Sequence, residues 1–114
     1  MTVDKKFAII AFRGEKPCVL HAILNCEDMR NRGMDAILIL EGGSVKFIKQ
    51  MHNNEFTVPW ERIQPLIDCA CLGCSKMFSV DQDAKEAGIR LESGMSGHVS
   101  LGEYILKGYG IIVL

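Results

Sequence analysis

The fold is decided by two short apolar stretches, KFAIIAF at residues 6–12 and DAILILE at residues 35–41. A short and almost continuous apolar run of this kind predicts a strand that is buried on both faces, as in a parallel sheet. Between the two stretches, apolar residues recur at helical spacing from Val19 to Met29, and Gly33 can end that helix. The sequence therefore predicts a strand–helix–strand unit with parallel strands.

The rest of the chain continues this alternation, except for residues 55–64, which show no clear pattern. The predicted elements are a helix over residues 45–51, a strand over 66–71 that Gly73 ends, a helix over 80–87 and strands over 89–91 and 111–114. The alternation predicts a single domain over residues 1–114. Its predicted fold is a three-layer α/β/α Rossmann-like (flavodoxin-like) domain with a mainly parallel five-stranded sheet.

Two serines have the spacing of a capping box, in which a serine starts a helix and a Glu or Gln follows three residues later. Ser79 and Gln82 predict the start of the helix over residues 80–87. Ser100 and Glu103 predict the start of a last helix, which Gly108 ends.

The composition excludes several classes of protein. The 114 residues include 13 basic and 14 acidic side chains, for a formal net charge of -1, and no basic run stands out. This balance argues against direct binding to nucleic acid. No run of about 18 apolar residues could span a membrane, and residues 1–6 lead into an apolar run too short for a secretory signal. We therefore expect a cytoplasmic protein.

Glycine-bearing loops are predicted to gather at one edge of the sheet. In an open α/β sheet, ligands bind outside the carboxyl ends of the strands. These ends carry the loops at residues 13–16, 41–44, 71–74 and 93–98. One of these loops contains two cysteines and another contains His98, so we expect thiols and an imidazole to face a common edge.

The cysteines are the main candidates for chemistry. There are five, an odd number, which in a reducing compartment favours reactive thiols, metal ligands or core residues over a disulfide framework. Cys71 and Cys74 have CxxC spacing, which permits a disulfide across a turn and also metal ligation. Because side chains alternate along a strand, Cys69 and Cys71 should point to the same face of theirs. Cys18 and Cys26 lie on the first helix, where we expect ordinary packing.

His98 precedes the last helix in a glycine-rich loop. It could act as a base or a cation beside the thiols, bind a metal, or be an ordinary surface residue. Together with Cys69, Cys71 and Cys74 it would complete a Cys₃His zinc set. The second CxxC of a zinc ribbon is missing from the sequence.

Gly42-Gly43-Ser44 follows the second strand and could bind the anionic group of a cofactor through backbone N–H groups. The full G-x-G-x-x-G and Walker patterns are missing, so a simple turn is the alternative.

The second half of the chain resembles a known family. The residues that carry the resemblance are ACLGCS at 70–75 after a buried strand, GI at 88–89, GMSGHVSL at 94–101 and GYGIIV at 108–113. They are similar to the DsrE/DsrF-like (YchN-like) sulfur-relay family, and in element order the resemblance covers essentially the whole chain.

The resemblance implies a five-stranded Rossmann-like domain that forms homo-oligomers, commonly trimers or hexamers. It also implies a cysteine after the third strand that carries sulfur as a persulfide between a donor and an acceptor protein. In this sequence Cys71 best matches that position, and Cys74 is an additional thiol. One cysteine suffices for such a relay, whereas this sequence has Cys69 as well.

Three hypotheses follow. The first is a sulfur carrier or sulfurtransferase without a cofactor, in which Cys71 is the persulfide nucleophile, Cys74 a resolving or second thiol, and His98 stabilises the thiolate. The second is a metal- or ligand-binding module, with zinc held by the Cys₃His set. The third is a non-catalytic oligomeric subunit with buried cysteines that acts through its partners.

Overall fold

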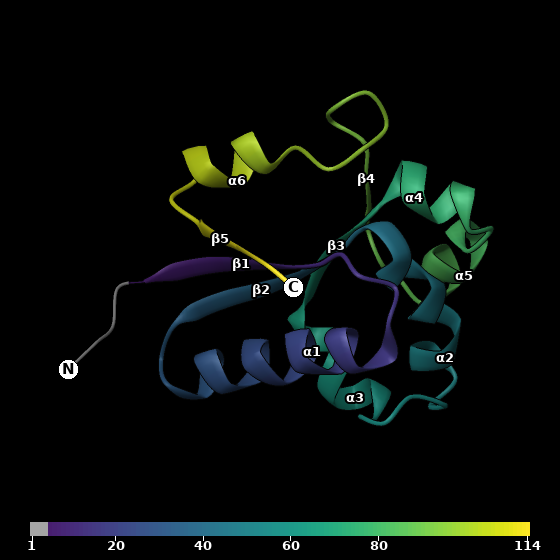
Figure 1. Cartoon of the computed structure of the whole chain (residues 1–114), viewed down its shortest axis with the longest axis horizontal. Helices are drawn as coiled ribbons and strands as arrows, with labels where there is room; N and C mark the ends of the chain where they lie inside the picture. The colour runs from purple at the N-terminus through teal and green to yellow at the C-terminus, as the bar shows by residue number, and fades with distance from the viewer. Residues whose placement is uncertain (1–4) are drawn as a thin grey trace.

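A single five-stranded sheet forms the middle of the protein in a computed structural model that describes residues 5–114 (Figure 1). Its order is β4-β3-β2-β1-β5, and every pair of neighbouring strands is parallel. The strands are β1 (Lys6–Ala11), β2 (Asp35–Leu40), β3 (Ile67–Cys71), β4 (Leu91–Glu92) and β5 (Gly110–Val113). This arrangement confirms the predicted Rossmann-like class with helices on both faces.

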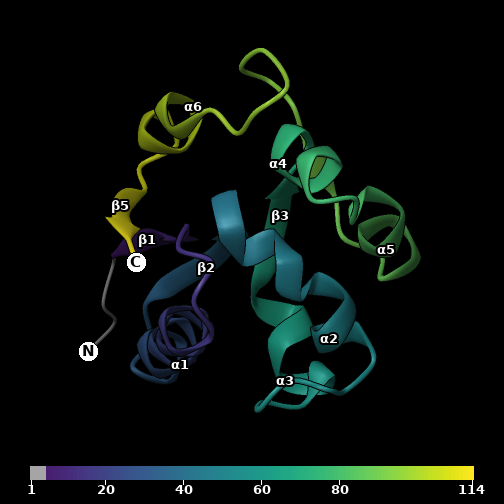
Figure 2. The ribbon, with the colours of Figure 1, turned by 45° about the vertical axis from the view of Figure 1, so that its right-hand side comes forward.

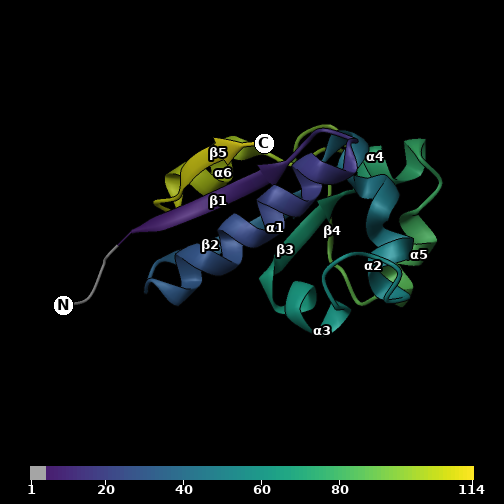
Figure 3. The ribbon, with the colours of Figure 1, turned by 60° about the horizontal axis from the view of Figure 1, so that its bottom comes forward.

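The helices lie on the two faces in very unequal amounts. The α-helices are α1 (Lys16–Asn31), α2 (Ile48–His52), α3 (Trp60–Ile63), α4 (Leu72–Met77), α5 (Asp81–Glu86) and α6 (Leu101–Leu106), and the 3-10 helices are η1 (Gly42–Phe47) and η2 (Gln64–Leu66). Strands β1 to β4 are added in one direction and β5 is added on the other side of β1. Because such crossovers are right-handed, α6 lies on the face opposite α1, as Figures 2 and 3 show.

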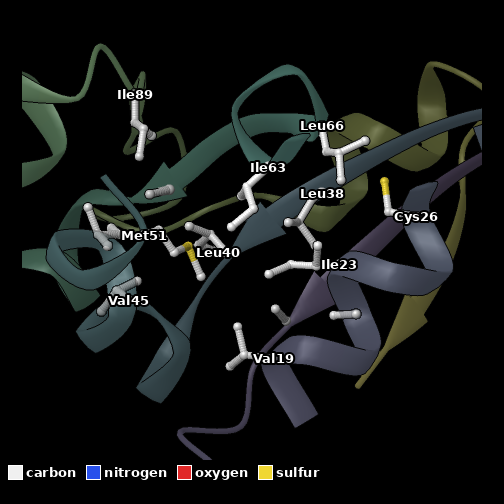
Figure 4. Close-up of a cluster of buried hydrophobic side chains, with 14 of the residues drawn as sticks. Val19, Ile23, Cys26, Leu38, Leu40, Val45, Met51, Ile63, Leu66 and Ile89 are labelled. Carbon is white, nitrogen blue, oxygen red and sulfur yellow. The ribbon is translucent and has the colours of Figure 1, made fainter. Parts of the chain in front are cut away.

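The pleat of the sheet divides the core into two parts. The larger part contains Ile9, Leu38 and Ala70 from the sheet and packs against α1, η1, α2 and α3 (Figure 4). The smaller part packs against α6 and includes Ile39, Cys69 and Cys71. Because side chains alternate along a strand, the two cysteines of β3 share one face, as predicted, and that face is the α6 side.

One of the two predicted capping boxes is wrong. Ser79 has a φ of 57°, and the residue before α5 is Val80, with no side-chain cap. The reason is that Ser79 and Val80 end α4, a helix that the sequence did not predict. Their N–H groups donate to the carbonyls of Lys76 and Ser75, and a residue in this left-handed position cannot also start a helix.

The second predicted capping box is confirmed for its serine. Ser100 is the N-cap of α6, and its Oγ accepts the Glu103 N–H at 3.4 Å. Gly108, with a φ of +94°, follows the helix as predicted.

Several predicted boundaries shift. Gly73 does not end the third strand but lies inside α4, because this helix starts directly after β3. The strand predicted over residues 89–91 lies at Leu91–Glu92, and Ile89 packs into the larger core instead. Residues 55–64 include the short helix α3.

No helix within residues 5–114 combines the length and the apolarity that crossing a membrane requires. The expectation of no secretory signal rests partly on residues 1–4, which lie outside the described residues.

Candidate functional site

Cys71, Cys74 and His98 meet at the carboxyl end of β3. Cys71 is the last residue of β3, Cys74 lies in the first turn of α4, and His98 lies in the loop between β4 and α6. The two Sγ atoms and one ring nitrogen of the histidine all lie within 4.8 Å of one another. The structure therefore brings together the three residues that the sequence singled out as catalytic candidates.

The imidazole of His98 faces both sulfurs. Its Nδ1 lies 3.1 Å from Cys71 Sγ and 3.8 Å from Cys74 Sγ. The backbone N–H of Cys74 also donates to Cys71 Sγ, at 3.4 Å. A histidine in this position is within hydrogen-bond distance of both thiols.

Gly73 allows the imidazole to approach this closely. A Cβ at Gly73 would lie 2.6 Å from Cε1 of His98. The Gly73 N–H also donates to the carbonyl of Gly97 at 2.7 Å, and two backbone hydrogen bonds join Met95 and His98. The loop that carries His98 is thus attached to the start of α4.

The three side chains differ in burial. Cys71 is fully buried, whereas Cys74 and His98 are half-buried. Burial, and next the hydrogen bond with Cys71, raise the pKa of Cys74 to about 11, while a backbone hydrogen bond from Gly42 acts in the opposite direction. A molecule that approaches from solvent therefore meets Cys74 and His98 before it meets Cys71.

Cys69 is not part of this group, which corrects the predicted Cys₃His set. Its Sγ lies 3.2 Å from the hydroxyl of Tyr104 instead. Cys69 is on the same face as Cys71 but two residues earlier, and the rise of a strand separates such residues by about 6.6 Å. Burial raises the pKa of Cys69 to about 11.

The loop Gly42-Gly43-Ser44 uses most of its N–H groups within the protein. Gly43 donates to the carbonyl of Phe12, and Ser44 donates to that of Glu41. Gly42 has a φ of +54°, and a Cβ there would lie 2.7 Å from the Phe12 carbonyl oxygen, so the turn requires glycine. The Gly42 backbone lies beside the Cys74 thiol, and the binding of an anion by the loop stays a prediction.

Sequence reasoning missed a cavity beside the site. The cavity of about 370 Å³ is lined by Ile10, Phe12, Glu41, Met95, Val99, Leu101 and Val113. Burial raises the pKa of Glu41, and the charge of nearby His98 opposes this. The lining comes from several separate segments of the chain, so no local sequence pattern could have indicated it.

The cysteines of α1 lie away from the site. Cys26 is buried in the larger core, as predicted. Cys18 is half-buried and lines a second cavity of about 420 Å³, together with Arg13 and His21.

The fold and the site together define a small parallel α/β protein with a cysteine pair and a histidine at the carboxyl edge of its sheet. The chain is 31% identical over 100 residues to "Uncharacterized protein MJ0733" of Methanocaldococcus jannaschii, and the match covers 86% of this chain and 81% of that protein. The chain belongs to the family of that protein. No protein-family model matches this chain.

Two further similarities accompany this match. An "Uncharacterized protein" of Archaeoglobus fulgidus is 45% identical over 38 residues, which make up 33% of this chain and 62% of that protein. The solved structure of the conserved protein of unknown function BT1422 from Bacteroides thetaiotaomicron superimposes with a TM-score of 0.71 and 25% identity, covering 96% of this chain and 95% of that one. This superposition supports the Rossmann-like class.

Proposed function

We propose that this protein is a sulfur carrier or sulfurtransferase of the DsrE/DsrF-like type, which holds sulfur as a persulfide on Cys71. The observation that carries the proposal is the 3.1 Å distance between Cys71 Sγ and His98 Nδ1. A thiol becomes nucleophilic when a base removes its proton, and His98 is placed to do so. The Cys74 N–H then stabilises the thiolate.

In the loading step, the Cys71 thiolate attacks the outer sulfur of a persulfide on a donor protein. A bond forms between Cys71 Sγ and that sulfur, and the S–S bond of the donor breaks. The donor leaves as a thiolate and takes the proton that His98 holds. Delivery to an acceptor thiol is the same reaction in reverse.

The burial of Cys71 adds a requirement to this chemistry. Because Cys71 is fully buried beneath half-buried neighbours, a donor has to displace the Cys74 side chain or the loop of His98 before it reaches the sulfur. Protection from water and stray thiols suits a carrier whose cargo is reactive.

The test is sulfur loading measured by intact mass after exposure of the reduced protein to glutathione persulfide. We expect one added sulfur atom at the earliest times, removed by reductant and mapped to Cys71. Cys71→Ser abolishes the loading, whereas Cys18→Ser, which changes a half-buried cysteine outside the site, leaves it unchanged. Loading that persists in a folded Cys71→Ser protein overturns the proposal.

A zinc site is the second candidate function. It is favoured by the three ligand atoms within 4.8 Å of one another, since two thiolates and an imidazole suit Zn²⁺ and leave a fourth position open. Protein purified without chelator would then contain one zinc ion per chain, and either Cys71→Ser or Cys74→Ser would remove it. Metal-free protein that fails to take up added Zn²⁺ rejects this candidate.

We further propose that the protein is a homo-oligomer, a trimer or hexamer as the family resemblance implies. Large apolar side chains are exposed on the thinly covered α6 side, among them Ile105, Leu106 and Val113. Groups of exposed apolar side chains usually mark interfaces. Native mass spectrometry gives the subunit number, and a monomer at micromolar concentration would reject the proposal.

We also place the protein in the cytoplasm. All five cysteines are free thiols in the described part of the chain, which suits a reducing compartment. Fractionation of the cells that make the protein tests this placement.

A further inference from the structure

We infer that Cys74 makes this site a sulfide-releasing centre: its thiol attacks the persulfide of Cys71, expels the outer sulfur as hydrosulfide and leaves a Cys71–Cys74 disulfide. The inference rests on the proposed persulfide at Cys71. It adds an activity to the carrier, namely the reduction of bound sulfane sulfur to sulfide.

The geometry of the two thiols supports this reaction. Cys74 follows Cys71 by three residues, so both side chains lie on the same side of the first turn of α4. Their sulfurs and His98 Nδ1 lie within 4.8 Å of one another. The hydrogen bond from the Cys74 N–H to Cys71 Sγ already holds the two residues together at 3.4 Å. The CxxC spacing permits a disulfide across such a turn.

The histidine supplies the proton transfer for both thiols. Nδ1 of His98 lies 3.8 Å from Cys74 Sγ, compared with 3.1 Å from Cys71 Sγ. Once Cys71 carries sulfur, it no longer has a thiol proton to give. The same nitrogen is then available to take the proton of Cys74.

The reaction balances without an external oxidant. His98 takes the proton of Cys74, and the Cys74 thiolate attacks Cys71 Sγ. The new Sγ–Sγ bond forms while the bond between Cys71 Sγ and the outer sulfur breaks, and the outer sulfur leaves with the electron pair as hydrosulfide. It then gains the proton from His98. Over loading and release together, the two cysteine thiols lose two electrons to form the disulfide and the transferred sulfane sulfur gains them as sulfide. A dithiol reductant then returns the site to its starting state.

Among the cysteines, only Cys74 is placed to do this. Cys69 points its sulfur at the Tyr104 hydroxyl, 3.2 Å away, Cys26 lies in the larger core, and Cys18 lies on α1. Because Cys71 is fully buried, a thiol from another molecule reaches its persulfide less easily than Cys74 does. A neighbouring group held in place reacts as if it were present at very high concentration.

The experiment treats the reduced protein with one equivalent of glutathione persulfide, which yields glutathione and no sulfide when it loads a cysteine. Sulfide is measured with time, and non-reducing mass spectrometry follows the persulfide and the disulfide. We compare the wild type with Cys74→Ser, Cys74→Ala and the control Cys18→Ser, and subtract the sulfide that Cys71→Ser produces. Circular dichroism checks that each variant is folded.

We expect the wild type and Cys18→Ser to release one sulfide per chain and to form a Cys71–Cys74 disulfide. Both Cys74 variants should hold the persulfide at least ~10-fold longer and release no sulfide, since they lack the positioned thiol. Stable persulfide in the wild type overturns this inference but leaves the carrier standing. Failure of every protein to load, the Cys74 variants included, overturns the carrier and the inference with it. A disulfide between any other pair of cysteines also overturns the inference.

Discussion

Gly73 and His98 are in such close contact that no side chain larger than hydrogen fits between them. A Cβ at position 73 would lie 2.6 Å from Cε1 and 2.9 Å from Nε2 of the imidazole. The opposite ring nitrogen, Nδ1, is the one that faces the two sulfurs. The position of the His98 imidazole thus depends on the absence of a side chain at Gly73, in the first turn of α4.

We therefore expect Gly73→Ala to slow persulfide loading by about 10²-fold, the lower end of what a positioned general acid or base contributes. The added methyl group pushes the imidazole away from the sulfurs, although alanine itself favours the helix. The matched control is Gly102→Ala in α6, where the nearest atom to a new Cβ is Ser100 Oγ at 3.8 Å. Loading rates give the answer, and equal rates in the two variants would show that the contact has no role.

Replacing His98, the proposed base, should have a similar effect. We expect His98→Ala to lose about 10²-fold in loading rate, with rescue by added imidazole because the side chain is half-buried and the vacated space can be reached from solvent. A stopped-flow loading assay with and without imidazole measures this. If the rate is unchanged in His98→Ala, a group other than His98 accepts the thiol proton of Cys71.

The cysteines should differ sharply in their reaction with iodoacetamide at pH 8. Cys26 and Cys69 are fully buried, and burial raises the pKa of each thiol to about 11, so both should stay unmodified while the protein is folded. Cys18, which is half-buried, should react first. Peptide mass mapping with time records the order. Slow and equal reaction of all five thiols would instead support the non-catalytic subunit.

The stability of the fold should decrease at alkaline pH. Burial raises the pKa of Cys26 from 9.0 to about 11. Between these two pH values the unfolded chain loses the thiol proton and the folded chain keeps it. The stabilisation of the folded state by the protonated Cys26 thiol is therefore complete below pH 9 and is lost as the pH rises to about 11. A pKa difference of this size corresponds to about 3 kcal/mol in the free energy of unfolding.

Urea unfolding at pH 8 and pH 11 measures this loss. The control is Cys26→Ala, which starts less stable because of the cavity but should lose less between the two pH values. An identical loss in both proteins would assign the effect to other groups, such as Cys69 and Tyr104.

The exposed end of α6 tests the proposed oligomer. Leu106 is 90% exposed in the single chain, so Leu106→Glu should leave the fold intact while it lowers the subunit number. Native mass spectrometry and sedimentation check this, and Lys107→Glu serves as a neighbouring charge control. An unchanged assembly in Leu106→Glu would move the interface to another face.

The sheet was predictable from sequence because its strands are short apolar runs bounded by turns, as β1 and β2 are. The order of the strands was not, since a run of apolar residues does not specify its neighbour. Helix α4 was missed because its six residues include Gly73 and follow β3 without a loop. The resulting error at Ser79 came from counting a helix end as a helix start.

The site was partly predictable for a similar reason. Strand ends in a parallel sheet share an edge, so the meeting of Cys71, Cys74 and His98 followed from the predicted topology. The inclusion of Cys69 was wrong because a shared face does not bring residues to the same height along a strand. Cys69 belongs instead to a network in which the Tyr104 hydroxyl donates to Asp68 at 2.5 Å and Arg90 also bonds Asp68.

The unequal cover of the two faces has a consequence for the timing of the chemistry. One half of the core lies under α1 and several shorter helices, whereas the half that holds Cys71 is covered mainly by the six-residue helix α6 and the loop before it. Segments with few buried contacts open without global unfolding. We expect amide hydrogens of α6 to exchange faster than those of β1 and β2. In the proposed carrier, access of a donor to Cys71 would then be limited by how often α6 and the loop before it open. A substitution that stabilises α6 would therefore slow sulfur transfer without contacting a sulfur atom.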